Sequence, residues 1–206
     1  MALRDIPRAP IIAFGLFLLM AIPSFAEFYT DWLWFGEVGY RAVFMKSITA
    51  RSGMGSAVFL IAGAFLAFNL FVALSAVPLR NIVVVTPEGP RTISLQPRRL
   101  RPVVWLVSGL IALLLAGYAS SGWSSYLAFT QAVPFGQVDP VLGRDVSFYL
   151  FQWPFLSLVQ HLFFLMALLT VMTTTAAYAL AGNLGLRMGR GVFITESTRR
   201  HLSILL

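Results

Sequence analysis

A histidine and an asparagine stand inside long apolar stretches of this sequence. His161 lies in the uncharged run from residue 146 to 186, and Asn69 is the strongly polar residue of an earlier run. Ionisable or amide groups in an apolar environment are functional candidates because their burial is costly. A proton relay or ligand contact is one interpretation of His161. Neutral hydrogen bonding between helices, as for Asn69 and residues 173–175, is the favoured alternative.

Acidic residues offer a second kind of chemistry. Asp139 and Asp145, six residues apart, could join Glu37 or Asp31 in binding a divalent cation through carboxylate oxygens. Arg144 between the two aspartates opposes a cation, and turn formation or helix capping explains both carboxylates. We therefore predict no metal site and no cofactor.

The usual sequence signatures of enzymes are missing. The chain has no P-loop, no glycine-rich dinucleotide turn after a strand, no HExxH motif and no GxSxG elbow. Residues 185–191 form a basic loop without the lysine and hydroxyl pair of a phosphate loop. With no cysteine, thiolate chemistry is absent too. We predict that the protein is not an enzyme and has no catalytic residues.

The elements that position these residues follow from the apolar pattern. Hydrophobic residues make up 58% of the sequence and charged residues 11%, against about 25% charged in soluble domains. The pattern predicts an all-α, polytopic transmembrane helical bundle with short interfacial helices in the outer loops. The net charge of +7 comes from arginines between the apolar blocks, so no nucleic acid is expected as a partner. The expected partners are the lipid bilayer and other transmembrane helices or an extracytoplasmic domain of the same protein.

Four apolar blocks define the predicted domain organisation. The spans lie at about 10–28, 54–78, 102–119 and 155–181, with outer loops at 29–53 and 120–154 and a cytoplasmic loop at 79–101. Pro102 is suited to a first helical turn, and Pro154 divides a stretch that is too long for one span. A cleaved signal peptide ending at Ser24-Phe25-Ala26 is the alternative for the first block.

Basic residues set the orientation. With the N-terminus in the cytoplasm, eleven of the 15 Lys and Arg residues lie inside and four outside, as the positive-inside rule requires. The lipid-facing cluster Arg98, Arg99 and Arg101 could bind anionic head groups, although fixing the topology is the favoured interpretation. The runs 81–85 and 91–95 predict a hairpin. A new apolar run begins at the C-terminal end, which indicates a fragment of a longer protein.

Both outer loops are unusually aromatic. In the first, Gly36 and Gly39 are predicted to divide two short interfacial pieces, with tryptophans at head-group depth. In the second, Asp145 is predicted to cap a short interfacial helix that ends before Pro154.

These loops also carry a family resemblance. Thr30-Asp31-Trp32-Leu33-Trp34-Phe35, with Asp139-Pro140 and Gly143-Arg144-Asp145-Val146-Ser147-Phe148-Tyr149, resembles the bacterial uncharacterised protein family 0182, and the likeness extends to Arg199-Arg200-His201-Leu202. The loop-motif residues singled out as candidates are Asp31, Trp32, Trp34, Asp139, Gly143, Asp145 and Tyr149. The resemblance implies a plasma-membrane protein with about seven N-terminal spans before a large extracytoplasmic part, of which this chain is the first portion. It implies an uncleaved first span, and it carries over no established activity, so the function stays open.

The functional prediction is a noncatalytic anchoring or scaffold module of a larger multi-pass plasma-membrane protein. A segment of a transporter or channel is the alternative, because the first and third predicted spans are each followed by an aromatic segment, Trp32–Phe35 and Trp123–Phe129, as in a repeated topology. Broken helices would favour transport, and continuous, tightly packed helices would favour anchoring.

Overall fold

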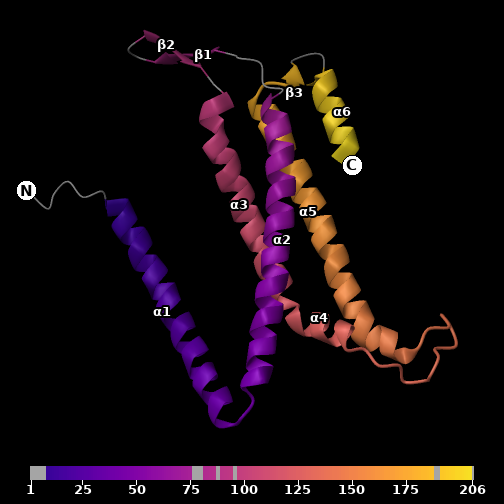
Figure 1. Cartoon of the computed structure of the whole chain (residues 1–206). Coiled ribbons are helices and arrows are strands. Elements are labelled where there is room, and N and C mark those ends of the chain that lie inside the picture. Colours follow the sequence, from indigo (N-terminus) through magenta and orange to yellow (C-terminus); the bar gives the residue numbers. More distant parts are fainter. Residues whose placement is uncertain (1–7, 76–80, 87–88, 95–96, 188–190, 206) are drawn as a thin grey trace, which may run out of the picture. The chain divides into compact units, whose positions relative to one another are not determined.

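The computed structural model describes residues 8–75, 81–86, 89–94, 97–187 and 191–205 (Figure 1). The elements are α1 (Arg8–Glu37), α2 (Arg41–Ser75), β1 (Asn81–Thr86), β2 (Gly89–Ser94), α3 (Pro97–Ser121), α4 (Trp123–Thr130), the π-helical turn η2 (Phe148–Gln152), α5 (Trp153–Leu180), β3 (Leu184–Arg187), β4 (Gly191–Ile194) and α6 (Glu196–Leu205). The predicted helical fold class is confirmed, and the strands of the described residues form only two short hairpins.

Three helical segments are long and apolar enough to cross a membrane: Arg41–Ser75, Leu100–Ser121 and Phe148–Leu180. They contain the predicted spans 54–78, 102–119 and 155–181 almost completely; residues 76–78 lie outside the described part. A helix suits these runs because it satisfies every backbone polar group within the segment. The first predicted span, 10–28, falls within α1, which continues through Pro23.

The chain divides into two compact units, residues 1–49 and 50–206. In the first unit, α1 ends in a double hydrogen bond: the N–H of Tyr40 donates to the carbonyl of Phe35 at 2.9 Å, and the N–H of Gly39 to that of Gly36 at 3.3 Å. Gly39 has a φ of 79°, the left-handed conformation this helix end needs. The predicted pair of short pieces is therefore wrong, because Gly36 is helical and only Gly39 ends a helix.

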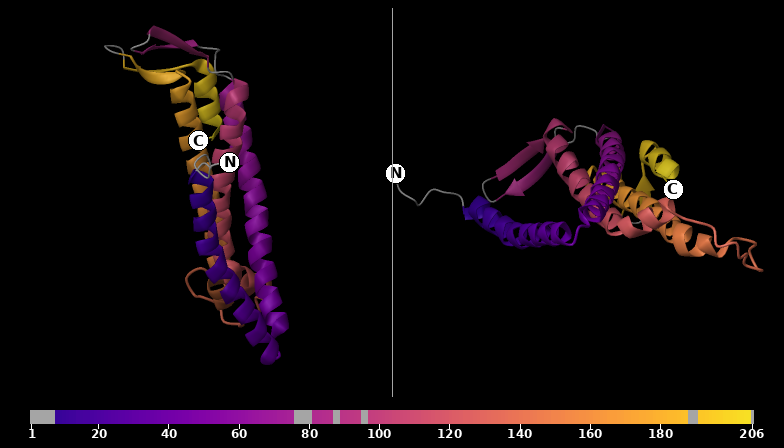
Figure 2. Two further views of the ribbon diagram at one scale, coloured as in Figure 1. Left: turned by 90° about the vertical axis from the view of Figure 1, so that its left-hand side faces the viewer. Right: turned by 60° about the horizontal axis from the view of Figure 1, so that its bottom comes forward.

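In the second unit, α2 and α3 approach each other through small residues. A Cβ on Gly63 would lie 3.5 Å from the Cβ of Ala112, and a Cβ on Gly55 would collide with the hydroxyl of Ser120. Leucine and methionine side chains of α5 pack on the buried Ala62 and Ala112, so that the three helices run side by side (Figure 2). Close van der Waals packing of this kind holds helices together where lipid removes the hydrophobic driving force.

Two helices begin earlier than the prolines Pro102 and Pro154 had indicated. α3 begins at Pro97, and Pro102 is inside it. Pro154 is at the start of α5, but the helix extends back through η2, where the N–H of Trp153 donates to the carbonyl of Phe148. Since proline has no N–H, the α-helical bonding cannot continue at that point, and the wider π turn accommodates the missing bond. The predicted helix ending before Pro154 is thus wrong; it is continuous with α5.

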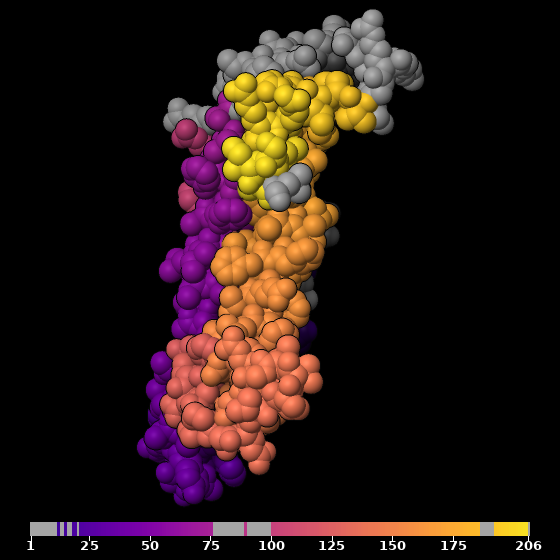
Figure 3. Space-filling view, turned by 90° about the vertical axis from the view of Figure 1, so that its right-hand side faces the viewer, coloured from indigo at the N-terminus to yellow at the C-terminus, as the bar shows by residue number. Residues whose placement is uncertain are grey.

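Short hairpins follow two of the spans. β1 pairs with β2 from Asn81↔Ser94 to Thr86↔Gly89, which confirms the predicted hairpin; its turn residues 87–88 lie outside the described part. β3 and β4 form a second hairpin where we predicted a basic loop, with residues 188–190 again outside the described part. After this hairpin, α6 lies against α2 and α5 (Figure 3).

Candidate functional site

A chain of hydrogen-bonded polar side chains, two of them buried and the third half-buried, joins three helices of the second unit. Asn69 on α2 and Tyr178 on α5 are 4% and 1% exposed, and both contact His201 on α6. His201 Nε2 lies 3.0 Å from Asn69 Oδ1, and His201 Nδ1 lies 2.9 Å from the hydroxyl of Tyr178. We call these three residues the polar chain. It fastens α6 to two of the spans.

The hydrogen bonds determine the direction of donation along the polar chain. The amide nitrogen of Asn69 donates to the carbonyl of Phe65 at 2.7 Å, so its oxygen faces His201. That oxygen can only accept, and therefore Nε2 of His201 carries the proton. Nδ1 is then an acceptor, and the Tyr178 O–H donates to it. The neutral imidazole satisfies every contact.

The environment favours the same protonation state. Burial lowers the pKa of His201 below its ordinary value of 6.5, because a charged imidazolium loses hydration there. A proton on Nδ1 would also face the Tyr178 hydroxyl, which would have to turn away in a buried site. The polar chain is therefore built for a neutral histidine.

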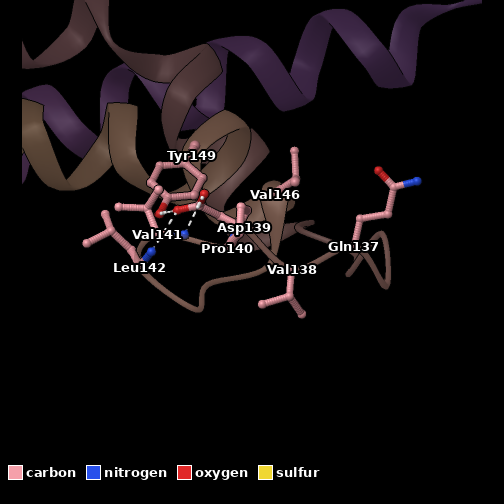
Figure 4. Close-up of a pocket in the computed structure, with 8 residues that line it drawn as sticks. All are labelled: Gln137, Val138, Asp139, Pro140, Val141, Leu142, Val146 and Tyr149. Atoms are coloured by element: carbon pink, nitrogen blue, oxygen red, sulfur yellow. Dashed lines mark hydrogen bonds between the residues drawn. The ribbon is translucent and has the colours of Figure 1, made fainter.

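A second arrangement is the carboxylate loop, residues 133–147, between α4 and η2. The carboxylate of Asp139 accepts hydrogen bonds from the N–H of Val141 at 3.2 Å, the N–H of Leu142 at 3.0 Å and the hydroxyl of Tyr149 at 2.9 Å (Figure 4). Gly143 closes this turn with a φ of 64°, and its N–H donates to the carbonyl of Asp139. Asp139 thus acts as the cap of a tight turn.

Asp145 holds the other half of the carboxylate loop. Its carboxylate accepts hydrogen bonds from the N–H groups of Phe135 at 3.1 Å, Gly136 at 2.8 Å and Ser147 at 2.8 Å. The bond to Ser147 is the predicted capping interaction. These hydrogen bonds, with those of Ser147 the strongest, lower the pKa of Asp145 to about 2. The pKa of Asp139 is lowered too, chiefly by the N–H of Leu142.

The two aspartates are structural in this geometry. Residues 137–142 with Val146 and Tyr149 line a hollow of about 520 Å³, but the carboxylate of Asp139 on its wall is occupied by two backbone N–H groups and the Tyr149 hydroxyl (Figure 4). Arg144 lies over the Phe148 ring, 5.3 Å from its centroid. Among the described residues, no three His, Asp or Glu side chains converge as metal ligands would.

Of the candidate residues in the first unit, Trp32 packs against a buried phenylalanine, Phe44. Phe44 is 6% exposed, and the rings of Phe28, Trp32 and Phe35 lie 5.2 to 6.0 Å from it. Arg41 stacks over Trp32 at 5.3 Å. Asp31 and Trp34 are exposed on α1. The aromatic motif thus forms a small core at the junction of two helices.

The remaining candidates lie on exposed or self-contained positions. His161 is exposed on α5, away from the polar chain. The hydroxyls of Thr173 and Thr174 donate to carbonyls of their own helix, so they do not provide the predicted bonds between helices. Arg101 is exposed on α3, whereas the side chains of Arg98 and Arg99 lie outside the described part.

Sequence reasoning found Asn69 but missed its partners. His201 stands in the Arg199–Leu202 motif that contributes to the family resemblance, and Tyr178 near the inner end of a predicted span. A buried amide needs a hydrogen-bond partner, so Asn69 itself indicates that another polar side chain must lie beside it.

The second unit belongs to the class of helical membrane-type bundles. In it, the neutral polar chain attaches α6 to α2 and α5. The chain belongs to the uncharacterised protein family UPF0182, which matches residues 8–206. A UPF0182 protein of Geobacter sp. strain M21 is 38% identical over 181 residues, covering 87% of this chain and 20% of the relative.

Other relatives are also much longer bacterial proteins. A UPF0182 protein of Geobacter sulfurreducens is 35% identical over 200 residues (95% of this chain, 22% of the relative), and one of Mycobacterium bovis 30% over 195 residues (92% and 19%). This chain therefore spans about a fifth of the length of the relatives it matches. No solved structure matches it.

Proposed function

We propose that this segment is a noncatalytic scaffold in the bacterial plasma membrane. α2, α3 and α5 cross the bilayer with the chain's N-terminus in the cytoplasm, and they hold the carboxylate loop and α6 in fixed positions for the rest of the protein. The partners are lipid, further spans and an extracytoplasmic part of the same polypeptide.

The observation that carries the proposal is the continuity of the closely packed spans. α2 and α3 run unbroken through their apolar lengths and contact each other at glycine and alanine. Buried hydroxyls of α5, such as those of Thr170 and Thr174, donate within their own helix at 2.7 and 2.6 Å. A transporter of the broken-helix type needs unwound backbone at mid-membrane. The breaks in this bundle, at Gly122 and η2, lie at the ends of the apolar segments.

Unused surface on α5 supports the scaffold role. In the most apolar stretch of α5, only 6% is buried inside the structure, whereas the corresponding share is 33% in α2 and in α3. Lipid or further helices of a longer polypeptide can cover this face, and the relatives are more than four times as long as this chain.

The distance between α2 and α3 tests the proposal. Spin labels would be attached at Leu60 and Leu114, which are 68% and 73% exposed. The distance between the two labels would be measured by double electron–electron resonance in the full-length protein in nanodiscs. A scaffold gives one narrow distance distribution, unchanged between pH 5.5 and 7.5 and between sodium and potassium buffers. A second distance population that responds to these conditions would contradict the proposal and favour transport.

A wedge variant calibrates the measurement. Gly63→Leu places a side chain against Ala112 and should broaden or shift the distribution. Gly109→Leu is the matched control, because a Cβ there meets nothing within 4 Å and the distribution should stay narrow.

A further inference from the structure

An apolar hollow with a cationic edge lies where α2 ends and α3 begins. It has a volume of about 520 Å³ and is lined by Phe71, Leu74, Ser75, Arg101 and Trp105. This is within the range of small-molecule sites. Phe71 and Trp105 pack edge to face, 5.4 Å apart, and form its aromatic wall.

Arg101 brings an unneutralised charge to this hollow. Among the described residues Arg101 has no acidic partner. The ion pairs in this part of the chain lie on α6, where Glu196 pairs with Arg199 and Arg200. Within the hollow, the Ser75 hydroxyl already donates to the carbonyl of Val72 at 2.7 Å. Recognition of a negative charge therefore falls to the Arg101 guanidinium.

The start of α3 increases the need for an anion. Arg98, Arg99 and Arg101 all stand near its N-terminus, and its first turn has no acidic residue. The N-terminal end of a helix carries a partial positive charge, so basic side chains there are electrostatically unfavourable. An anion bound at Arg101 would offset the charge of this guanidinium next to the helix end.

The surroundings of the hollow are lipid-like. Trp105 and Leu106 are each 62% exposed, Phe68 on α2 is 67% exposed, and the apolar surface continues along α3 through Leu110. Tryptophan is favoured where a bilayer's head groups meet its acyl chains. A free phosphate would leave this apolar wall uncovered, whereas a phospholipid would cover it.

We propose that this hollow is a binding site for an anionic phospholipid, with the phosphate on Arg101 and the first acyl carbons against Phe71, Leu74 and Trp105. The site depends on α2 and α3 crossing the membrane but not on the scaffold role. Movement between α2 and α3 in the distance measurement would contradict the scaffold and leave the lipid site standing.

Native mass spectrometry of the full-length protein tests the site. Retention of phosphatidylglycerol and phosphatidylcholine would be compared for wild type, Arg101→Gln, Arg101→Lys and the control Arg144→Gln, an arginine of the carboxylate loop. One basic residue near a membrane surface contributes enough for about a fivefold change in affinity. Arg101→Gln should therefore retain phosphatidylglycerol about fivefold more weakly, while Arg101→Lys and Arg144→Gln should not.

Three outcomes would overturn the proposal. They are equal losses in Arg101→Gln and Arg144→Gln, equal retention of the two lipids by wild type, and displacement of the lipid by millimolar glycerol phosphate, which would identify a soluble phosphate as the ligand. Should Arg101→Gln not fold, wild type in vesicles of brominated lipid decides. The Trp105 fluorescence is the difference between the wild-type signal and the signal of Trp105→Phe. Brominated phosphatidylglycerol should quench this fluorescence more than brominated phosphatidylcholine does, and equal quenching would refute the site.

Discussion

Replacing Tyr178 by phenylalanine removes one oxygen atom from the polar chain and keeps the ring that fills the site. The hydroxyl is the donor to His201 Nδ1, and Tyr178 is 1% exposed, so water cannot replace it. A neutral hydrogen bond contributes about 1 kcal/mol net, and a buried group left unpaired costs about 1–3 kcal/mol. We expect Tyr178→Phe to weaken the attachment of α6 by about 1 kcal/mol. His201→Ala, which leaves the Asn69 side-chain oxygen and the Tyr178 hydroxyl unpaired, should weaken it more.

Hydrogen exchange of the α6 amides in the full-length protein measures this attachment. About 1 kcal/mol corresponds to exchange roughly fivefold faster through local opening. His161→Ala is the matched control, since it removes the exposed histidine of α5. Equal exchange of α6 in His161→Ala and His201→Ala would refute the role of the polar chain. Asn69→Ala added to His201→Ala should cost little more, because the two residues share one hydrogen bond.

The same attachment should depend on pH. Burial lowers the pKa of His201, so the folded state prefers the neutral ring and the unfolded state takes up a proton first. The stabilisation is fully present above the ordinary pKa of 6.5 and decreases as the pH falls through the lowered value. Relative to amides of α3, exchange in α6 should accelerate below about pH 6.5 in wild type. This acceleration should be absent in His201→Ala, and its persistence there would point to another titrating group.

Three further perturbations follow from the structure. Gly53→Ala should raise the melting temperature, since alanine gains about 1 kcal/mol in a helix and its Cβ meets open space, whereas Gly55→Ala should lower it because its Cβ meets α3. Pepsin should cut the carboxylate loop of wild type increasingly as the pH falls from 3.8 to about 2, because Asp145 becomes protonated in this range and loses its stabilising hydrogen bonds. Asp145→Asn should be cut throughout that range. Phe44→Ala should destabilise the first unit by about 3–5 kcal/mol in hydrogen exchange, and Val43→Ala, at a site that is 54% exposed, should change little.

The features that sequence predicted well are those that one short segment determines. Long uncharged runs predict helices because lipid or protein must surround them, and α2, α3 and α5 follow those runs. The cap formed by Asp145 and the β1–β2 hairpin each depend on residues of one short segment. Helix boundaries were less predictable: Pro102 and Pro154 looked like starts, yet an earlier proline and a π turn let both helices begin sooner.

The polar chain shows why the rest could not be predicted. Asn69 and His201 are 132 positions apart, and nothing local to either indicates the other. Asn69 was expected to find its partner in another span, yet its partner lies on α6, which the β3–β4 hairpin turns back against the spans. Because the second hydrogen bond of His201 reaches Tyr178, one imidazole satisfies two buried groups that the apolar spans could not satisfy themselves. A lone amide in a span therefore indicates a docking partner in the polar segments that flank the membrane as much as in a neighbouring helix.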